Sequence, residues 1–428
     1  MEKVKSSIPG LGYPSGRDDP IKSGQGFIEG RIRDDGAEGL WRIGNGLYDL
    51  TDWEKFHPGG SEWINLTKGT DITEAFEVHH LTEKPQRIMP RFYVRDANSP
   101  RSIPFTFADN GFYRKFKKRV QIALKDVDFQ NPSKSSNLMT DTLFILTLIS
   151  SMIAAATNFS LAFAISGIFL AWTTIAAHNY LHMKHHFRMY YFDLSLMSSK
   201  EWRITHALCH HLYPNTIWDQ EIYAFEPLVN WLPKQKPVLK RIIGVIITPF
   251  IIMLGFLKEG IKRYYLVYKV WKKFEFRDLV PLFLPLLLCF VAPNPISAIK
   301  SWMIIIFCGS FVFFCIGINA AHHHPDIFHD GDIYRKDLDW GLLTIDTVRG
   351  RDIIDESSFL TLTNFGAHIL HHLLPTVDHA YLPLCQKAFN DTCKEFNINS
   401  TDKFNSLELI KGQFLQQIRL EKVDNCRM

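Results

Sequence analysis

Histidine side chains gather in a few short segments of this sequence. Fifteen of its 18 histidines lie between positions 178 and 379, in segments that include HNYLH (178–182), HALCHH (206–211) and HILHH (368–372). Histidines three or four positions apart share one face of a helix. A single histidine near a membrane boundary is more often a hydrogen-bonded surface residue than a ligand. Three clusters with ligand spacing in one region instead predict a metal site.

The number of imidazoles indicates how many metal ions such a site holds. Imidazole nitrogen binds iron, zinc, copper or nickel, so the residue type alone does not select the metal. A fourth segment, NAAHHHPDIFH (319–329), raises the supply to about eight to ten nitrogens. Because one ion binds fewer ligands than this, the sequence predicts two metal ions.

A different pair of histidines stands near the N-terminus. In YDLTDWEKFHPGGSEW (48–63), Pro58 keeps His57 out of helical geometry, and the two glycines that follow permit a sharp turn. The segment GTDITEAFEVHH (69–80) then offers His79 and His80. Two imidazoles on opposite faces of an iron porphyrin give a six-coordinate centre suited to passing single electrons. HPGG alone is more often a surface turn, so the prediction of a haem rests on both segments together.

Apolar runs of about 20 residues, the length that a membrane-spanning helix needs, place the histidine clusters. Four of them predict two membrane hairpins and cover residues 139–157, 159–177, 279–294 and 299–318. A fifth apolar segment, 242–256, is interrupted by Pro249 and flanked by cations. We expect it to be interfacial or re-entrant, because a fifth span would separate the clusters. The basic segment 258–277 that follows it indicates that the shared side is cytosolic.

The remaining segments differ in composition. Residues 1–25 are rich in Gly, Pro, Ser and charge and are expected to lack fixed structure. Residues 26–96 alternate short apolar runs with turn signals, which is typical of a small α+β domain. Residues 97–138 are expected to form a linker with a basic amphipathic stretch, 110–125, that suits a membrane surface. Residues 139–428 form the membrane domain.

The overall composition excludes some classes of partner and compartment. The formal net charge of +4 is too small and too dispersed for a nucleic-acid partner. The seven cysteines form no CxxC pair and are expected to be reduced thiols. The first ten residues contain no apolar core, so a cleaved signal peptide is not expected.

Two resemblances follow from these motifs. YDLT, HPGG, GTDITEAF and a second histidine 23 positions after His57 resemble the cytochrome b5 haem domain over residues 25–96. This resemblance implies haem b with His57 and His80 as axial ligands, His80 being favoured over His79 because it stands four positions after Phe76. HxxxH, HxxxHH and HxxHH, in this order over residues 105–400, resemble the histidine boxes of the membrane fatty acid desaturase and hydroxylase superfamily. Together the two parts resemble cytochrome b5 fusion desaturases, and in particular the insect cytochrome b5-related proteins.

The second resemblance implies a non-haem centre of two iron ions and a ligand set. In stearoyl-type members an Asn and a His four positions apart complete the set; Asn319 and His323 match this spacing, and His322 competes with His323. Asn179 and His368 depart from the usual front-end desaturase pattern, which has Asp and Gln there; the first departure bears on tuning of the ligands and the second on regiochemistry. Four acidic residues near the boxes could orient ligand imidazoles or could be solvated loop residues: Asp193, Glu201, Asp219 and Asp378. The implied ligands are His178, His182, His206, His210, His211, His368, His371, His372, His323 and Asn319.

The expected fold is an α+β cytochrome b5-like haem domain followed by an all-α integral-membrane domain with four transmembrane helices plus interfacial helices. The resemblance implies an O2-dependent fatty acyl desaturase that acts on an acyl-CoA or acyl lipid. Electrons would come from NADH-cytochrome b5 reductase through the chain's own haem. The expected location is the endoplasmic reticulum, with haem domain and histidine boxes cytosolic. A lipid hydroxylase with the same centre and a non-catalytic membrane haem protein are the alternatives.

Overall fold

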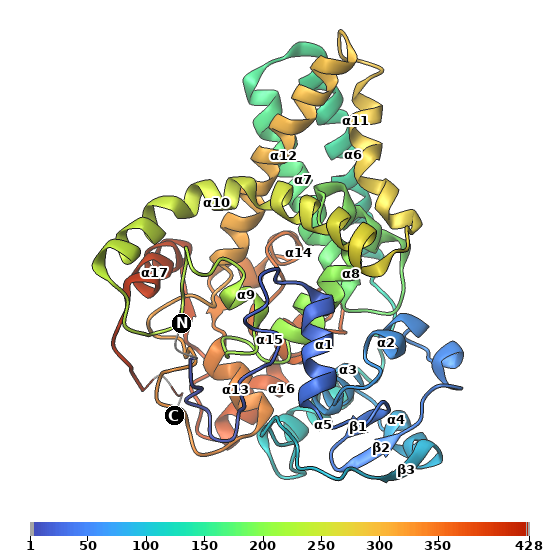
Figure 1. The fold of residues 1–428 in the computed structure, drawn as a ribbon, viewed down its shortest axis with the longest axis vertical. Helices are drawn as coiled ribbons and strands as arrows, with labels where there is room; N and C mark the ends of the chain where they lie inside the picture. The colour runs from blue at the N-terminus through green and yellow to red at the C-terminus, as the bar shows by residue number, and fades with distance from the viewer. Residues whose placement is uncertain (1–3, 425, 427–428) are drawn as a thin grey trace.

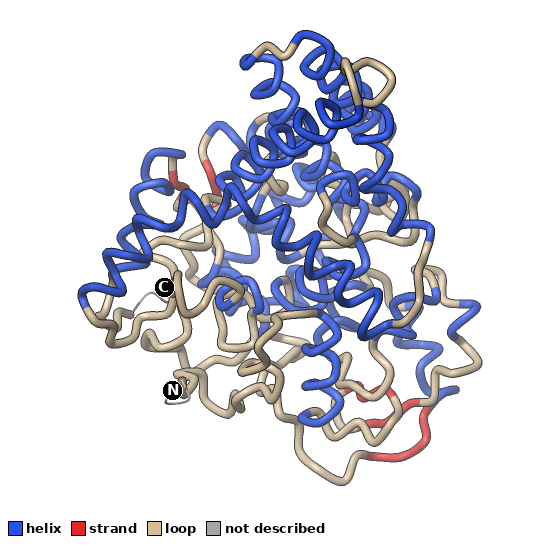
Figure 2. Tube along the Cα trace, turned by 45° about the horizontal axis from the view of Figure 1, so that its top comes forward, coloured by secondary structure: helices blue, strands red, loops and turns tan. Residues whose placement is uncertain are grey.

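The computed structural model describes residues 4–424 and 426. Figure 1 shows a helical bundle that projects from a larger body, with a small domain at the opposite end from the bundle. Strands are few, and most of the chain is helix and loop (Figure 2). This arrangement confirms the expected fold class of a small α+β domain followed by a mostly helical remainder.

The small domain is built on a three-stranded antiparallel sheet. Its strands are β1 (Trp41–Ile43), β2 (Gly46–Tyr48) and β3 (Tyr93–Asp96), in the order β1-β2-β3. Its helices are α2 (Ser61–Leu66), α3 (Thr73–His79) and α4 (Lys84–Ile88). The core comprises Trp41, Leu50, Ile64, Phe76 and Met89. These side chains hold the sheet and helices around the loop that carries His57.

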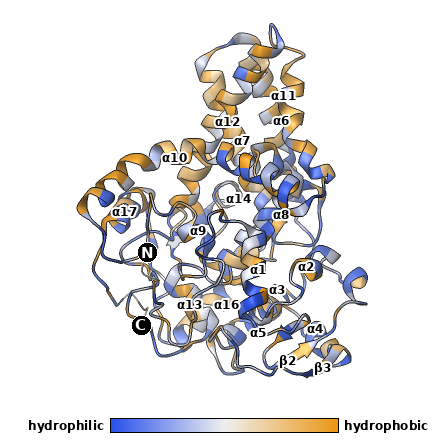
Figure 3. Ribbon diagram, in the orientation of Figure 1, coloured by the Kyte–Doolittle hydropathy of each residue, from blue (hydrophilic) through white to orange (hydrophobic). Residues whose placement is uncertain are grey.

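Four helices are long and apolar enough to cross a membrane. They are α6 (Lys134–Thr157), α7 (Ser160–Leu181), α12 (Pro295–Ile318) and the continuous helical segment Val238–Trp271, which begins with α10 (Val238–Tyr265). Apolar residues cover these helices in Figure 3. The sequence predicted α6, α7 and α12 as spans, but assigned the remaining span to 279–294. There the helix α11 (Val280–Leu288) has only nine residues and rises about 14 Å, half of a bilayer core.

α11 and α10 lie differently with respect to the bundle. α11 packs beside α6 and α12, whereas α10 runs across the base of the bundle (Figure 1). Phe225, shortly before α10, borders the histidine cleft described below, and Arg277, shortly after it, pairs with Glu62 of the small domain. α10 therefore begins and ends on the same side of the bundle as the histidines. Its outward face is apolar, since Ile246 and Phe250 are exposed.

The N-terminal segment is ordered against the body, in contrast to the expectation that residues 1–25 lack fixed structure. Ile8 and Leu11 are buried in the main core. The Ser7 amide donates to Asp330 at 2.7 Å, and the Trp218 indole donates to the Gly12 carbonyl at 2.8 Å. The expectation rested on composition, which does not report partners more than 200 positions away.

The basic stretch predicted for a membrane surface is a buried helix instead. α5 (Phe112–Ala123) packs against α13 (Trp340–Thr347) and α16 (Leu382–Glu395), and Phe112, Phe116 and Val120 are fully buried. Four of its cations pair with protein carboxylates; Arg119, for example, pairs with Glu395 at 2.6 Å. The apolar face of the helix is therefore covered by protein.

The other elements form the body between the bundle and the small domain. The helices are α1 (Gly24–Asp34), α8 (Ser199–Trp202), α9 (Gln220–Tyr223), α13 (Trp340–Thr347), α14 (Ser358–Thr363), α15 (His368–Leu373), α16 (Leu382–Glu395) and α17 (Ser406–Ile418). β4 (Gly350–Arg351) and β5 (Lys403–Phe404) form a short parallel pair.

Candidate metal centre and haem pocket

Four segments bring histidines together at the base of the bundle. α7 ends with His178 and His182 one turn apart, and α15 carries the HILHH segment. HALCHH lies on a π-helix, Arg203–His210, and the turn after α12 supplies a further histidine. In the π-helix the amide of His211 bonds the carbonyl of His206, five positions earlier, at 2.9 Å. This geometry pairs His206 with His211, whereas ordinary helical spacing would pair it with His210.

Five histidines form one group, called here the five-histidine group. Its donor nitrogens all lie within 4.8 Å of one another. The Nε2 atom of His178 lies 2.8 Å from that of His182 and 2.8 Å from that of His206. The members are His178, His182, His206, His211 and His371.

A second group, the three-histidine group, lies beside the first and comprises His210, His322 and His372. The Nε2 atom of His322 lies 3.2 Å from that of His210 and 3.0 Å from that of His372. The His368 ring is adjacent, with its centroid 4.7 Å from that of His322. His368 Nε2 is buried and has no hydrogen-bond partner within the described residues, so it is available as a further donor.

These donors fit two metal ions. With metal–nitrogen distances of about 2.0–2.1 Å, neighbouring ligand nitrogens lie about 2.8–3.4 Å apart. The observed nitrogen separations of 2.8–3.2 Å match this range. Burial and neighbouring imidazoles hold the pKa values of His182, His211 and His371 well below the usual histidine value. This shift favours the neutral rings, whose lone pairs a metal requires.

Carboxylates face the far side of two of these rings. Asp219 lies 2.9 Å from His210 Nδ1, and Glu221 lies 2.6 Å from His206 Nδ1. Although burial lowers the pKa of His210, Asp219 and Glu221 outweigh it and raise that pKa to about 9. A carboxylate on the outer nitrogen orients a ligand imidazole and increases its basicity. Sequence reasoning singled out Asp219 but missed Glu221, whose signal was its position two residues later.

The other acidic candidates have different partners. Asp193 pairs with Arg263 at 2.8 Å, and Glu201 accepts from the Gly24 amide at 2.5 Å. Asp378 accepts from Asn179 at 3.0 Å. The following residue, His379, reaches His371 Nδ1 at 3.2 Å. Among the described residues, Asp378 therefore supports the candidate ligand His371 through His379, the next residue in the sequence.

The three-histidine group contains His322, the competitor, and does not contain the predicted His323. The His323 ring stacks on Trp231 with centroids 3.9 Å apart. α12 ends at Ile318, and Ala321 adopts a left-handed φ of 70°, so helical spacing does not continue from Asn319 to His323. The Asn319 amide donates to the Cys315 carbonyl at 2.8 Å, and its Oδ1 is buried without a hydrogen bond to any described residue.

His185, His186 and His324 stand apart from both groups. His185 bonds the Tyr190 hydroxyl at 2.8 Å, and His186 accepts from the Arg188 amide at 3.3 Å. His324 accepts from the Asp326 amide at 3.1 Å. The structure thus assigns these three to local hydrogen bonds.

The small domain presents His57 and His80 to each other across a pocket. Their ring centroids are 6.0 Å apart. Two imidazoles bound to one iron at about 2 Å would place their centroids about 6 Å apart, so His57 and His80 could together hold the iron of a haem. His57 Nδ1 bonds the Gly60 carbonyl at 3.0 Å and His80 Nδ1 bonds the Phe76 carbonyl at 2.9 Å, which leaves each Nε2 for the iron. His79 lies against Trp63 instead, with centroids 5.8 Å apart.

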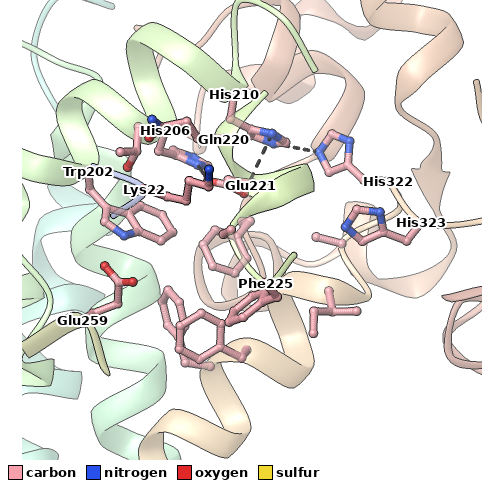
Figure 4. A pocket seen from close by; sticks show the side chains of 18 of the residues that line it. Lys22, Trp202, His206, His210, Gln220, Glu221, Phe225, Glu259, His322 and His323 are labelled. Carbon is pink, nitrogen blue, oxygen red and sulfur yellow. Dashed lines mark hydrogen bonds and ion pairs between the residues drawn. The ribbon is translucent and has the colours of Figure 1, made fainter. Parts of the chain in front are cut away.

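A cleft with aromatic walls borders the histidine groups (Figure 4). Trp202, Phe225 and Phe313 line it, and His206, His210 and His322 line it as well. Lys22, Lys258 and Lys262 also line the cleft. Such a cleft suits an apolar chain that carries a polar end group.

Comparison with known proteins finds a matching family profile for each of the two parts of the chain. The family profile described as fatty acid desaturase matches residues 154–403, and that described as cytochrome b5-like heme/steroid binding domain matches residues 32–98. The chain is 38% identical over 426 residues to the Drosophila melanogaster cytochrome b5-related protein, covering 98% of this chain and 97% of that protein. It is 25% identical to the Mortierella alpina acyl-lipid (8-3)-desaturase, covering 82% and 87% of the two chains. No solved structure matches the chain.

Proposed function

Since the chain belongs to the fatty acid desaturase family and carries a cytochrome b5-like domain ahead of it, we propose that it desaturates a lipid acyl chain. The observation that carries the proposal is the meeting of nine buried imidazoles from four segments beside an aromatic cleft. These imidazoles would hold two non-haem iron ions, and His57 and His80 would hold haem b. When bound, the iron ions supply O2-dependent removal of hydrogens from an unactivated methylene, and the haem supplies single electrons.

The chain's own residues position the substrate and exclude water. Trp202, Phe225 and Phe313 form apolar walls that keep an acyl chain extended toward the histidines. The two groups meet along the π-helix, where the His206 and His210 rings have centroids 5.2 Å apart. Asp219 and Glu221 fix the orientation of these rings from behind.

We also propose where the enzyme lies in the cell, what supplies its electrons and which class of substrate it takes. It is a membrane protein in which α10 lies along the interface, because both its ends are on the histidine side and its outer face is apolar. The haem domain and the metal site then share the cytosolic side of the endoplasmic reticulum membrane, since Lys258, Lys262 and Arg263 follow the apolar part of α10. NADH-cytochrome b5 reductase on that side would supply the electrons, and the substrate would be an acyl-CoA or an acyl lipid.

The test is expression of the full chain in yeast with profiling of cellular lipids, alongside a His371→Ala control. His371 belongs to the five-histidine group, so this variant should lack the activity. A new unsaturated acyl species that is absent from the control supports desaturation. A new hydroxylated species would identify the alternative hydroxylase. Purified protein that contains one haem iron and no further iron would refute the enzyme proposal.

A further inference from the structure

The haem domain contacts the rest of the chain through residues that do not line its pocket. Arg101, in the segment that leaves the domain, pairs with Asp71 at 2.6 Å and with Glu74 at 2.5 Å. Both carboxylates are fully buried. On α5, the Lys117 ammonium donates to the Glu77 carbonyl at 2.7 Å. These contacts make the haem domain a packed part of the body rather than a domain on a loose tether.

A second ionic contact lies on the pocket side. Glu62 of α2 pairs with Arg203 at 2.5 Å and with Arg277 at 2.9 Å. The Arg203 side chain is only 1% exposed, and its guanidinium also lies over the Trp63 ring, 4.7 Å from the centroid. A buried arginine held by a carboxylate on another domain is a directional contact, because its fork of donors fits only one arrangement.

Arg203 connects this contact to the metal site. It donates to the Leu181 carbonyl at 3.2 Å and to the Met183 carbonyl at 3.3 Å. These two carbonyls flank His182, a member of the five-histidine group. Glu62 therefore acts on the backbone around a candidate metal ligand through a single arginine.

The haem pocket and the metal site share a wall at this position. His57 and His80 line the pocket from the haem domain, and His182, Met183 and Leu208 line it from the membrane domain. His182 is thus next to the haem pocket and within the metal cluster at the same time. Figure 1 shows the small domain lying against the body.

We propose that the haem domain works while docked, and that Glu62, Arg203 and Arg277 form a latch that keeps the haem pocket against His182. The haem of each chain then serves the metal site of the same chain without moving between partners. The electron-transfer part of this inference rests on the proposed function, whereas the docking part does not.

The latch is tested in the full-length protein with Glu62→Gln and Glu62→Arg. The matched control is Glu83→Gln, because Glu83 is also on the haem domain but pairs with Arg87 of the same domain, both exposed. Haem absorption reports whether each variant retains its haem. Hydrogen exchange of segments 57–66 and 181–185 reports docking without reference to activity.

We expect Glu62→Arg to raise exchange in both segments at least about tenfold, Glu62→Gln to raise it less, and Glu83→Gln to leave it unchanged. Unchanged exchange in Glu62→Arg overturns the latch. The second measurement is the oxidation of ferrous haem, prereduced with limiting NADH and reductase, after mixing with O2 and, in separate runs, with acyl-CoA or with an acyl lipid. One electron leaves each ferrous haem, which becomes ferric, and would pass to the metal site. There, two such electrons, two protons and the two hydrogens removed from the acyl chain would reduce one O2 to two waters. We expect the rate of haem oxidation to fall at least about tenfold in Glu62→Arg.

The two readouts separate the two claims. Increased exchange with an unaltered oxidation rate shows that docking does not govern electron transfer, which overturns the functional part of the inference. Ferrous haem that is not oxidised in the wild type under these conditions refutes the proposed function. In that case the exchange data alone still decide whether the latch exists.

Discussion

Replacing His322 with alanine should remove one non-haem iron ion, whereas replacing the adjacent His323 should not. His322 Nε2 lies 3.2 Å from His210 Nε2 and 3.0 Å from His372 Nε2, so it supplies one of three donors in the three-histidine group. His323 contributes no nitrogen to either group, because its ring stacks on Trp231. The two substitutions are the same chemical change at neighbouring positions and control each other.

The magnitude follows from these contacts. Loss of a residue that only supports a ligand costs about 10–100-fold in metal affinity, so loss of the ligand itself should cost at least about 100-fold. This factor equals about 2.8 kcal/mol. His323→Ala instead loses a stacked ring pair, worth about 0.5–1.5 kcal/mol beyond area burial. We therefore expect a lower melting temperature for His323→Ala with normal iron content.

The assay is total iron per haem in purified full-length protein. The wild type should contain about three iron atoms per chain, one in the haem and two in the histidine groups. His322→Ala should contain about two or fewer after dialysis against a weak chelator, and His323→Ala about three. Normal iron in His322→Ala together with loss in His323→Ala would refute the reasoning and support the ligand spacing predicted from Asn319.

Three further predictions follow from other contacts. His80→Ala should lose the haem Soret absorption and His79→Ala should keep it, because only His80 faces His57 at 6.0 Å; the reverse result would exchange their roles. Glu221→Gln should weaken metal binding about 10–100-fold in a chelator competition, because Glu221 orients His206 at 2.6 Å. Glu259→Gln, in the same cleft, should not weaken it. Equal effects of the two substitutions would contradict an orienting role for Glu221. Burial and the neighbouring cations Lys234 and Arg419 lower the pKa of Lys236 to about 7. Between about pH 7 and 10.5 the unfolded chain therefore binds a proton that the folded protein has released. The melting temperature of the wild type relative to Lys236→Met should therefore rise from pH 7 to pH 9, and a fall would refute the assignment.

Several features of the site could be predicted from residue types and local spacing. Histidines three or four positions apart share a helical face, so His178 and His182, or His368 and His371, could be paired without coordinates. The HPGG turn and the histidine 23 positions after His57 lie in one short segment of the sequence, and together they indicated a haem pocket. The long apolar runs of α6, α7 and α12 were visible because a spanning helix needs about 20 consecutive apolar residues.

The tertiary structure decided how these parts meet. The π-helix divides HALCHH between two groups, and the left-handed turn at Ala321 selects His322 over His323. Glu62 and Arg203, 141 positions apart, meet across the domain boundary. The same holds for the buried helix α5 and the ordered segment around Ile8 and Leu11. Sequence periodicity reports which side chains share one face of one element, whereas distances between elements depend on turn geometry and on the packing of the whole chain.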